Sequence, residues 1–541
     1  MRITDSETPD QLDLARIVRG DAGGVPRRAA SWAGAIGAAS ALAVAELWAG
    51  LTASVPPLTT SVGQLFIPFT PGWLKQVAIA LFGTADKPVF VVGVVIVSLA
   101  LGAWAGRRAR TSFVAPLALF GGLGLFGVIA SLDQPGASAG VVALSTLSAV
   151  VVGIATLSWL LRLARTGAEP ADAAVEAATA GVTLGRRPLL VGGSFAVVGA
   201  ASAALLGNTL RRARIQSVIS STEITLPPAL AGAIDGVPAL TPANSLAVDG
   251  ITPLVVPNDD FYRIDTAIGT PLVDAATWSM TIGGMVDNPI TFTYDDLLAE
   301  EVVERYVTLM CVSNEVGAGL VGNALWRGVL LGPLLERAGV QPGAGQVVGR
   351  SIDGWAGGFP LEAAFDRDAM IAFAMNGEPL PAAHGFPARL VVPGVYGYVS
   401  ATKWLAEIEI TTWEGFDGYW VPRGWSKLGP VKTQSRIDVP RDGARLGTAG
   451  PTVIAGVAWA QTRGIQQVEV RHGETEWVQA ELSAPLSKDT WVQWRATLDL
   501  PEGESFVAVR ATDGDGVTQT EERSRVDPDG ATGHHTVRVA T

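Results

Sequence analysis

Residues 307–314 read Val-Thr-Leu-Met-Cys-Val-Ser-Asn, an apolar strand that runs into a polar turn and carries Cys311, the only cysteine of the 541-residue chain. A lone thiol cannot form an internal disulfide. The stretch alone leaves two interpretations open, a small buried hydrophobic residue or a thiolate that serves chemistry. Because free cysteine is among the most buried residue types, packing is the simpler interpretation of this residue taken by itself.

The chain divides into two parts of different composition. The first 210 residues are rich in Ala, Gly, Val and Leu, whereas the remainder holds most of the acidic residues, tryptophans and prolines. The net charge of -12 arises mainly from the C-terminal part. Because phosphate binding needs a basic face, this composition argues against nucleic acid as a partner.

Five apolar stretches are each long enough to form a helix across a bilayer, which takes about 20 residues. They lie near residues 31–54, 88–106, 111–131, 138–161 and 188–207. A further segment, 62–82, contains Pro68, Pro71 and Lys75, so it fits a re-entrant or interfacial piece better than a sixth crossing, which stays open. No histidine precedes His384, and no iron–sulfur cysteines are encoded. Neither haem nor an iron–sulfur cluster is expected, and the helices are predicted to be an anchor or docking platform.

Arginines flank these stretches in a pattern that predicts orientation, because Lys and Arg concentrate in short cytoplasmic segments. With five spans, the main clusters all fall on the cytoplasmic side and everything after residue 210 lies outside. Arg211, Arg212 and Arg214 oppose this assignment and leave a cytoplasmic C-terminal half as the alternative. Arg186 and Arg187 resemble the start of a twin-arginine export signal, although the positive-inside rule alone also explains such a pair.

The C-terminal part consists of three segments that differ in composition and in the pattern of polar and apolar residues. Residues 208–257 are rich in Pro, Ala, Ser and Thr, which predicts an extended linker. Short strands then alternate with helices without βαβ repetition, which indicates an α+β domain, with Thr293 capping one helix. Beyond 433, alternating polar and apolar residues in short runs predict a β-sandwich. The expected divisions are a cytoplasmic N-terminus over 1–30, a transmembrane domain over 31–207, the linker over 208–257, the α+β domain over 258–432 and the sandwich over 433–541.

Further motifs surround Cys311 along the chain. They are Asn258-Asp259-Asp260-Phe261-Tyr262-Arg263, Cys311-Val312-Ser313-Asn314, Ala324-Leu325-Trp326-Arg327-Gly328-Val329-Leu330, Met375-Asn376-Gly377-Glu378-Pro379-Leu380-Pro381, His384-Gly385-Phe386-Pro387-Ala388-Arg389, Pro393-Gly394-Val395-Tyr396-Gly397 and Lys403-Trp404-Leu405. In order and spacing they resemble the sulfite oxidase family of molybdopterin enzymes. The resemblance covers about residues 255–541. It implies a multidomain chain in which an all-α transmembrane bundle precedes a sulfite-oxidase-like α+β domain and an immunoglobulin-like dimerisation sandwich.

The resemblance also implies a molybdenum–molybdopterin cofactor whose metal is bound by the thiolate of Cys311. A soft thiolate is a good donor to a transition metal. The cofactor-binding residues that the family pattern implies are Asp259, Tyr262, Arg263, Cys311, Ser351, His384, Arg389, Gly397, Tyr398, Val399, Ser400 and Lys403. Taken singly, His384 would be a core or surface histidine and Arg389 a rim ion pair. Lys403 would be a solvated edge residue and Tyr262 ordinary packing.

The residues after Cys311 depart from the family pattern. Sulfite oxidases have Ala-Gly-Asn-Arg-Arg there, whereas Asn314 is followed by Glu315 and Val316, and residues 398–402 lack the second expected arginine. Arg263 is the one matching arginine left. Because a carboxylate repels an anion at short range, we expect a neutral or cationic oxide such as a sulfoxide as substrate, with Cys311, Glu315 and Arg263 as the catalytic residues. Sulfite oxidation and a non-catalytic assembly module are the alternatives.

The expected function is two-electron oxygen-atom transfer outside the cell membrane by a multi-pass membrane protein. Electrons would pass through a separate partner, such as a quinone, a cytochrome or another redox protein. A homodimer formed through the sandwich is implied by the resemblance. A third hypothesis, nucleophilic catalysis by Cys311 with His384 as base, finds no other support in the sequence.

Overall fold

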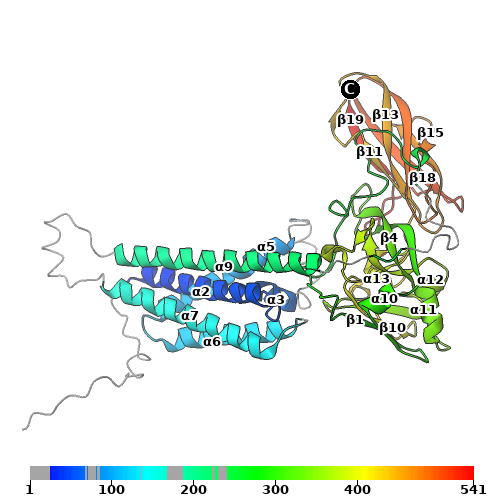
Figure 1. The fold of residues 1–541 in the computed structure, drawn as a ribbon. Helices are drawn as coiled ribbons and strands as arrows, with labels where there is room; N and C mark the ends of the chain where they lie inside the picture. Colours follow the sequence, from blue (N-terminus) through cyan, green and yellow to red (C-terminus); the bar gives the residue numbers. More distant parts are fainter. Residues whose placement is uncertain are drawn as a thin grey trace, which may run out of the picture. The chain divides into compact units, whose positions relative to one another are not determined.

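The computed structural model describes residues 25–66, 70, 81, 86–134, 136–166, 187–221, 226–228 and 240–541. Contacts within the chain separate a helical unit, Met1–Ser221 with Ala267–Gly269, from a second unit, Thr222–Thr266 with Thr270–Thr541. Figure 1 shows the helices of the first unit and the sheets of the second. Residues 1–24, Arg186 and most of the segment predicted to be re-entrant, 67–69, 71–80 and 82, lie outside the described residues.

The described part of the helical unit contains five long helices and a short one. They are α2 (Arg27–Leu51), α3 (Leu58–Phe66), α5 (Asp86–Arg108), α6 (Val114–Leu132), α7 (Ala139–Thr166) and α9 (Arg187–Ser221). The five long helices are apolar and long enough to cross a membrane. The predicted number and positions of the apolar helices are therefore confirmed for the described residues.

Helix α2 is the centre of this unit and packs against α5, α7 and α9. Glycines mark the closest approaches. A Cβ atom on Gly34 would lie 2.0 Å from the carbonyl oxygen of Gly102, and one on Gly50 would lie 2.4 Å from that of Gly207. Any larger residue at these positions would push the helices apart, so the small residues are required for the packing.

The predicted linker is wrong over much of its described length. Helix α9 continues past residue 207 to Ser221, because no proline interrupts the chain before Pro227 and the segment is rich in good helix formers. Residues 240–257 are not a free tether either. Leu254 and Val256 are buried in the core of the second unit. These apolar side chains, which lie between prolines, fix the segment to the folded unit although its composition is typical of a linker.

Two sheets make up the α+β part of the second unit, with the orders β2-β1-β10-β5-β6 and β3-β4-β7-β8, and β9 pairs with β7. The strands are β1 (Ser279–Gly284), β2 (Ile290–Thr293), β3 (Val302–Met310), β4 (Val321–Leu330), β5 (Gln346–Ser351), β6 (Ala356–Pro360), β7 (Met370–Met375), β8 (Glu378–Pro379), β9 (Arg389–Val391) and β10 (Leu405–Thr411). Only β1 and β10 pair in parallel among them, as expected without βαβ repetition.

Short helices connect these strands. They are α10 (Tyr294–Leu298), α11 (Leu331–Ala338), α12 (Glu362–Phe365), η4 (Ala382–His384), α13 (Gly397–Ser400) and η5 (Val421–Arg423), and η3 (Pro242–Asn244) precedes the sheets. The predicted cap is confirmed, because Asp296 donates its backbone N–H to Thr293 Oγ1 at 3.2 Å.

The residues after 433 form two further sheets, ordered β11-β13-β17-β16 and β12-β19-β18-β14-β15. Their strands are β11 (Gln434–Val439), β12 (Ala444–Arg445), β13 (Gly450–Trp459), β14 (Ile465–His472), β15 (Val478–Gln479), β16 (Glu481–Leu482), β17 (Val492–Leu500), β18 (Glu504–Asp513) and β19 (His535–Ala540). Alternate residues from both sheets enter one core, including Ile454, Trp494, Val470 and Val509. Two sheets around one core are the architecture of a β-sandwich.

A continuous core joins this sandwich to the α+β part. Trp459 and Trp491 belong to the same buried cluster as strands β3 and β4. The backbone N–H of Trp491 donates to Thr308 Oγ1 at 2.9 Å, and the indole of Trp459 lies 3.1 Å from the sulfur of Met310. The end of β3, directly before Cys311, is therefore held from the sandwich side.

Candidate active site

Cys311 is the first residue after strand β3. Its backbone N–H donates to the carbonyl of Leu320 at 3.0 Å, and its own carbonyl accepts from the N–H of Asn314 at 3.0 Å, which closes the turn. The residue is only 6% exposed. Burial raises the pKa of the Cys311 thiol, and hydrogen bonds at Ser313 and the charge of Lys403 oppose that shift. A thiol in this environment becomes a thiolate most readily when a metal cation binds it.

Helix α13 lies beside this strand end. A Cβ on Gly397 would come 3.7 Å from the carbonyl oxygen of Met310. The Tyr398 hydroxyl donates to the carbonyl of Ser426 at 2.5 Å, and the Ser400 hydroxyl donates to the carbonyl of Tyr396 at 3.1 Å. Val399 is buried. The side chains of Tyr398 and Ser400 in this predicted cofactor stretch are thus used in local contacts. Gly397 has no side chain that could bind a ligand, but it lets α13 lie close to the end of β3.

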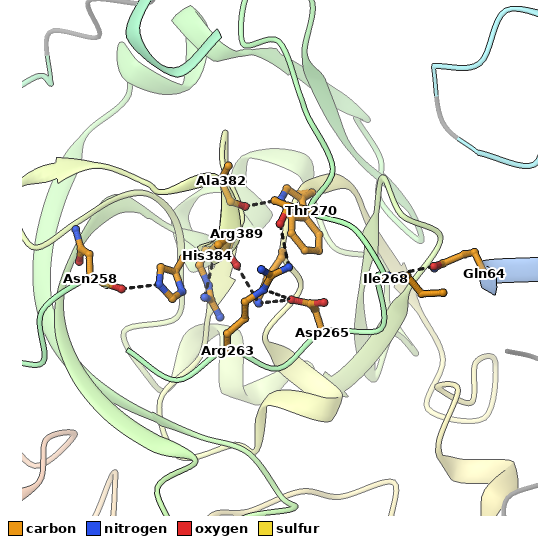
Figure 2. A network of polar contacts seen from close by, with 12 residues as sticks. Gln64, Asn258, Arg263, Asp265, Ile268, Thr270, Ala382, His384 and Arg389 are labelled. Carbon is orange, nitrogen blue, oxygen red and sulfur yellow. Dashed lines mark hydrogen bonds and ion pairs between the residues drawn. The ribbon is translucent and has the colours of Figure 1, made fainter. Parts of the chain in front are cut away.

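His384 and Arg389, both implied as cofactor-binding residues by the family resemblance, lie together. The Arg389 guanidinium donates from one Nη to the carbonyl of His384 at 3.0 Å and lies over the ring of Trp326 at 4.9 Å. His384 Nε2 is 2.8 Å from the carbonyl oxygen of Asn258, which only accepts, so this nitrogen carries the proton. Figure 2 shows both contacts.

These two side chains have shifted pKa values. Burial lowers the pKa of His384 to about 4, and the nearby Arg389, Lys403 and Arg263 add to that effect. Burial also lowers the pKa of Arg389 to about 10. At neutral pH the imidazole is therefore uncharged, whereas the guanidinium keeps its charge in a position that is only 4% exposed.

Lys403 and Arg263 both form ion pairs with the carboxylate of Asp265. No feature of the sequence singles out this residue. Asp265 Oδ2 lies 3.2 Å from Lys403 Nζ and 2.9 Å from Arg263 Nε. Arg263 also donates to the Thr270 hydroxyl at 2.9 Å, as Figure 2 shows. Lys403 further donates to the carbonyl of Ala383 at 3.1 Å, and burial lowers its pKa to about 8 although Asp265 opposes that shift.

Tyr262 lies near enough to Cys311 and Arg389 for their charges to affect its hydroxyl. Its ring stacks on Phe261 with the centroids 5.2 Å apart. Burial raises the pKa of its hydroxyl, the nearby Cys311 raises this pKa further, and Arg389 lowers it. Both residues therefore act electrostatically on the phenol. The structure therefore brings together Tyr262, Arg263, Cys311, His384, Arg389 and Lys403.

Three predicted residues stand apart from this cluster. Asp259 and Glu315 are exposed, and neither side chain has a hydrogen bond or ion pair with another described residue. Glu315 still lies on the loop that follows Cys311. Ser351 is buried at the end of β5, opposite Leu405 in the sheet register, and its hydroxyl accepts from the N–H of Asp353 at 3.2 Å.

The residues present fit an anionic, metal-binding cofactor. Arg389 has no carboxylate within ion-pair distance among the described residues, so a buried positive charge stays available for a phosphate. Asn314 is fully buried, its Oδ1 accepts from the N–H of Leu320 at 2.6 Å, and its Nδ2 donor is left without a partner. A buried unpaired donor beside Cys311 calls for a ligand acceptor.

Comparison with known proteins supports the same assignment. Residues 267–420 match the oxidoreductase molybdopterin binding domain. An uncharacterized oxidoreductase of Bacillus subtilis, YuiH, is 35% identical over 156 residues, which cover 29% of this chain and 76% of that protein. Human mitochondrial sulfite oxidase is 28% identical over 298 residues, 46% of this chain and 54% of that enzyme, so the chain spans about half the length of that relative. Sulfite oxidase of Arabidopsis thaliana is 27% identical over 319 residues, 48% of this chain and 80% of that enzyme.

Among solved structures, the sulfane dehydrogenase SoxCD of Paracoccus pantotrophus matches 56% of this chain and 86% of its own, with 24% identity and a TM-score of 0.47. The match to the molybdopterin binding domain and the similarity to the Bacillus subtilis oxidoreductase define a molybdopterin-dependent oxidoreductase. The chain belongs to the sulfite oxidase family, and its cofactor is molybdenum–molybdopterin.

Proposed function

We propose that this chain is a membrane-anchored enzyme that transfers an oxygen atom to or from a neutral or cationic oxide on the extracytoplasmic side, with sulfoxides as the first substrate class. The cofactor supplies the oxygen-transfer chemistry. Cys311 would bind its metal, and Arg389 with Lys403 would hold its phosphate by charge-assisted hydrogen bonds. His384, which is neutral, would position Arg389 and the segment around Asn258.

One observation carries the choice of substrate. Arg263, the one arginine that matches the anion-binding set, already pairs with Asp265 and with the Thr270 hydroxyl. The loop 311–320 contains Glu315 and neither Lys nor Arg. A doubly negative ion would therefore approach Cys311 along a loop that carries an acidic and no basic side chain, while Arg263 is already engaged by Asp265.

The location rests on the helices and their flanking charges. Five described helices are long and apolar enough to cross a membrane, and the arginine clusters favour a C-terminal half outside the cytoplasm. In this proposal the helical unit holds the enzyme at the membrane, and a separate redox partner exchanges electrons with it. The sandwich, which we take to be immunoglobulin-like, would serve dimerisation.

The test is a substrate comparison with the purified full chain in detergent, loaded with its cofactor. Oxidation of reduced benzyl viologen is followed with methionine sulfoxide, dimethyl sulfoxide and trimethylamine N-oxide. Sulfite is tested in the opposite direction with ferricyanide. We expect kcat/KM for at least one sulfoxide to exceed that for sulfite at least about tenfold, since one unfavourable charge is worth about 1.4 kcal/mol or more. A higher kcat/KM for sulfite would overturn the proposal.

A further inference from the structure

The helical unit contains a large apolar cavity that the proposed chemistry does not use. It measures about 680 Å³, is partly open to the outside of the helical unit, and is lined by side chains from α2, α3, α5, α6 and α7. Its walls include Leu42, Val62, Val97, Leu123 and Val150. Pockets that hold drug-sized ligands span roughly 300–1,000 Å³, so the cavity has the size of a ligand site.

A carboxylate is hydrogen-bonded to one residue of the cavity wall. Glu46 follows Leu42 by one helical turn on the same face of α2, and its Oε1 accepts a hydrogen bond from Thr59 Oγ1 at 3.0 Å. Thr59 itself is part of the cavity wall. An ionisable residue within an apolar span is costly, and such residues usually mark a ligand or proton pathway.

We propose that this cavity binds a quinol, with the apolar tail among the helices and a head-group hydroxyl donating to the Glu46 carboxylate. A phospholipid acyl chain would fill the apolar walls but carries no hydrogen-bond donor for Glu46. A quinol fits both features, because it carries an apolar chain and a hydroxyl donor on one molecule. All the residues that line the cavity belong to the helical unit.

The role of the quinol as the electron source rests on the proposed function, whereas its binding does not. Oxidation of a quinol to the quinone releases two electrons and two protons. Reduction of a sulfoxide to the sulfide and water consumes the same number of each, so the exchange balances.

The chain offers matched variants for the test. Gly93 lines the cavity, and a Cβ there would meet no atom within 4 Å, so Gly93→Phe can begin its side chain without a clash and is chosen to fill the cavity with its ring. Gly121 on α6 is equally open but is not among the residues that line the cavity, which makes Gly121→Phe the control. Glu46→Gln keeps the size of the side chain and removes the charge.

Full-length protein in phospholipid nanodiscs is equilibrated with decylubiquinol under argon, and the quinol retained per chain is measured by extraction and chromatography against empty nanodiscs. We expect saturable binding of about one molecule per chain. This binding should be lost in Gly93→Phe, kept in Gly121→Phe and weakened about tenfold in Glu46→Gln, because a hydrogen bond to a charged group is lost.

Retention equal to that of empty nanodiscs, or equal losses in Gly93→Phe and Gly121→Phe, would overturn the proposal. Unchanged affinity in Glu46→Gln would also overturn it, since the cavity would then hold only an apolar chain such as that of a phospholipid. Thermal unfolding of each variant in nanodiscs checks the fold. Because the readout is binding, a failed substrate assay does not affect the result.

Discussion

Asp265 and Lys403 form an ion pair of 3.2 Å whose two side chains are 4% and 9% exposed. This pair links the segment that carries Arg263 to the segment that carries the other basic residues. It also limits how much positive charge the site presents to an anion, because one carboxylate is shared by Lys403 and Arg263.

The first prediction concerns pH. Lys403 has a pKa of about 8 in the folded chain, below the value of about 10.4 in an unfolded chain. As pH rises through about 8, Lys403 loses the charge that would hold the cofactor phosphate. Because this pKa belongs to the cofactor-free chain, we expect the affinity for the cofactor, measured as pterin and molybdenum retained at equilibrium, to fall above pH 8 in the wild type. Lys403→Met should retain less of both at pH 7 and show no inflection near pH 8.

The stability of the apoprotein should respond in the opposite sense. Between pH 8 and about 10.4 the unfolded chain binds more protons at this lysine than the folded chain, so Lys403 adds to the free energy of unfolding as pH rises. A fall in cofactor affinity together with a rising contribution of Lys403 to the free energy of unfolding identifies the charge as the cause. Parallel loss of both in the wild type and in Lys403→Met would contradict this account.

The second prediction concerns acid. His384 has a pKa of about 4 in the folded chain against about 6.5 when unfolded. The unfolded chain therefore binds more protons between these values, and the free energy of unfolding falls as pH drops through that window, by up to about 3 kcal/mol. His384→Gln, which can still donate to the Asn258 carbonyl, should lose this pH dependence in urea unfolding. An unchanged dependence would show that another group is responsible.

The third prediction separates cofactor binding from stability. Arg389 is a buried cation without a carboxylate partner in the described residues, so the apoprotein bears the cost of its desolvation. Arg389→Met keeps the apolar stem and should raise the free energy of unfolding of the apoprotein by about 1–3 kcal/mol. The same variant should retain little molybdopterin, measured as its fluorescent oxidation product. Lower apoprotein stability with normal pterin content would reverse this assignment.

The fourth prediction concerns substrate choice. Glu315→Arg reverses the charge on the loop that follows Cys311, and we expect kcat/KM for sulfite to rise about tenfold while that for methionine sulfoxide falls. Glu301→Arg is the matched control, because Glu301 is also exposed in the same part of the chain. If both variants change sulfite turnover equally, the effect comes from net charge and not from the position of Glu315.

The sequence predicted the apolar helices, the α+β pattern without βαβ repetition and the cap at Thr293, because periodicity and capping residues report local structure directly. It missed Asp265, whose role depends on a contact 138 residues away along the chain with Lys403. Asn314 belongs to the sequence motif of Cys311, but only the structure shows that its Nδ2 is buried and has no hydrogen-bond partner. The linker was misjudged because composition does not reveal that Leu254 and Val256 find a core.

The central claim is that Cys311 binds the molybdenum of the cofactor. X-ray absorption at the molybdenum edge measures it directly, on wild-type protein and on Cys311→Ser, which differs by one atom and should fold normally. We predict that the variant, in whatever fraction retains metal, shows one sulfur neighbour fewer and an added oxygen or nitrogen neighbour, together with loss of activity. Identical sulfur coordination in the two proteins would contradict the account.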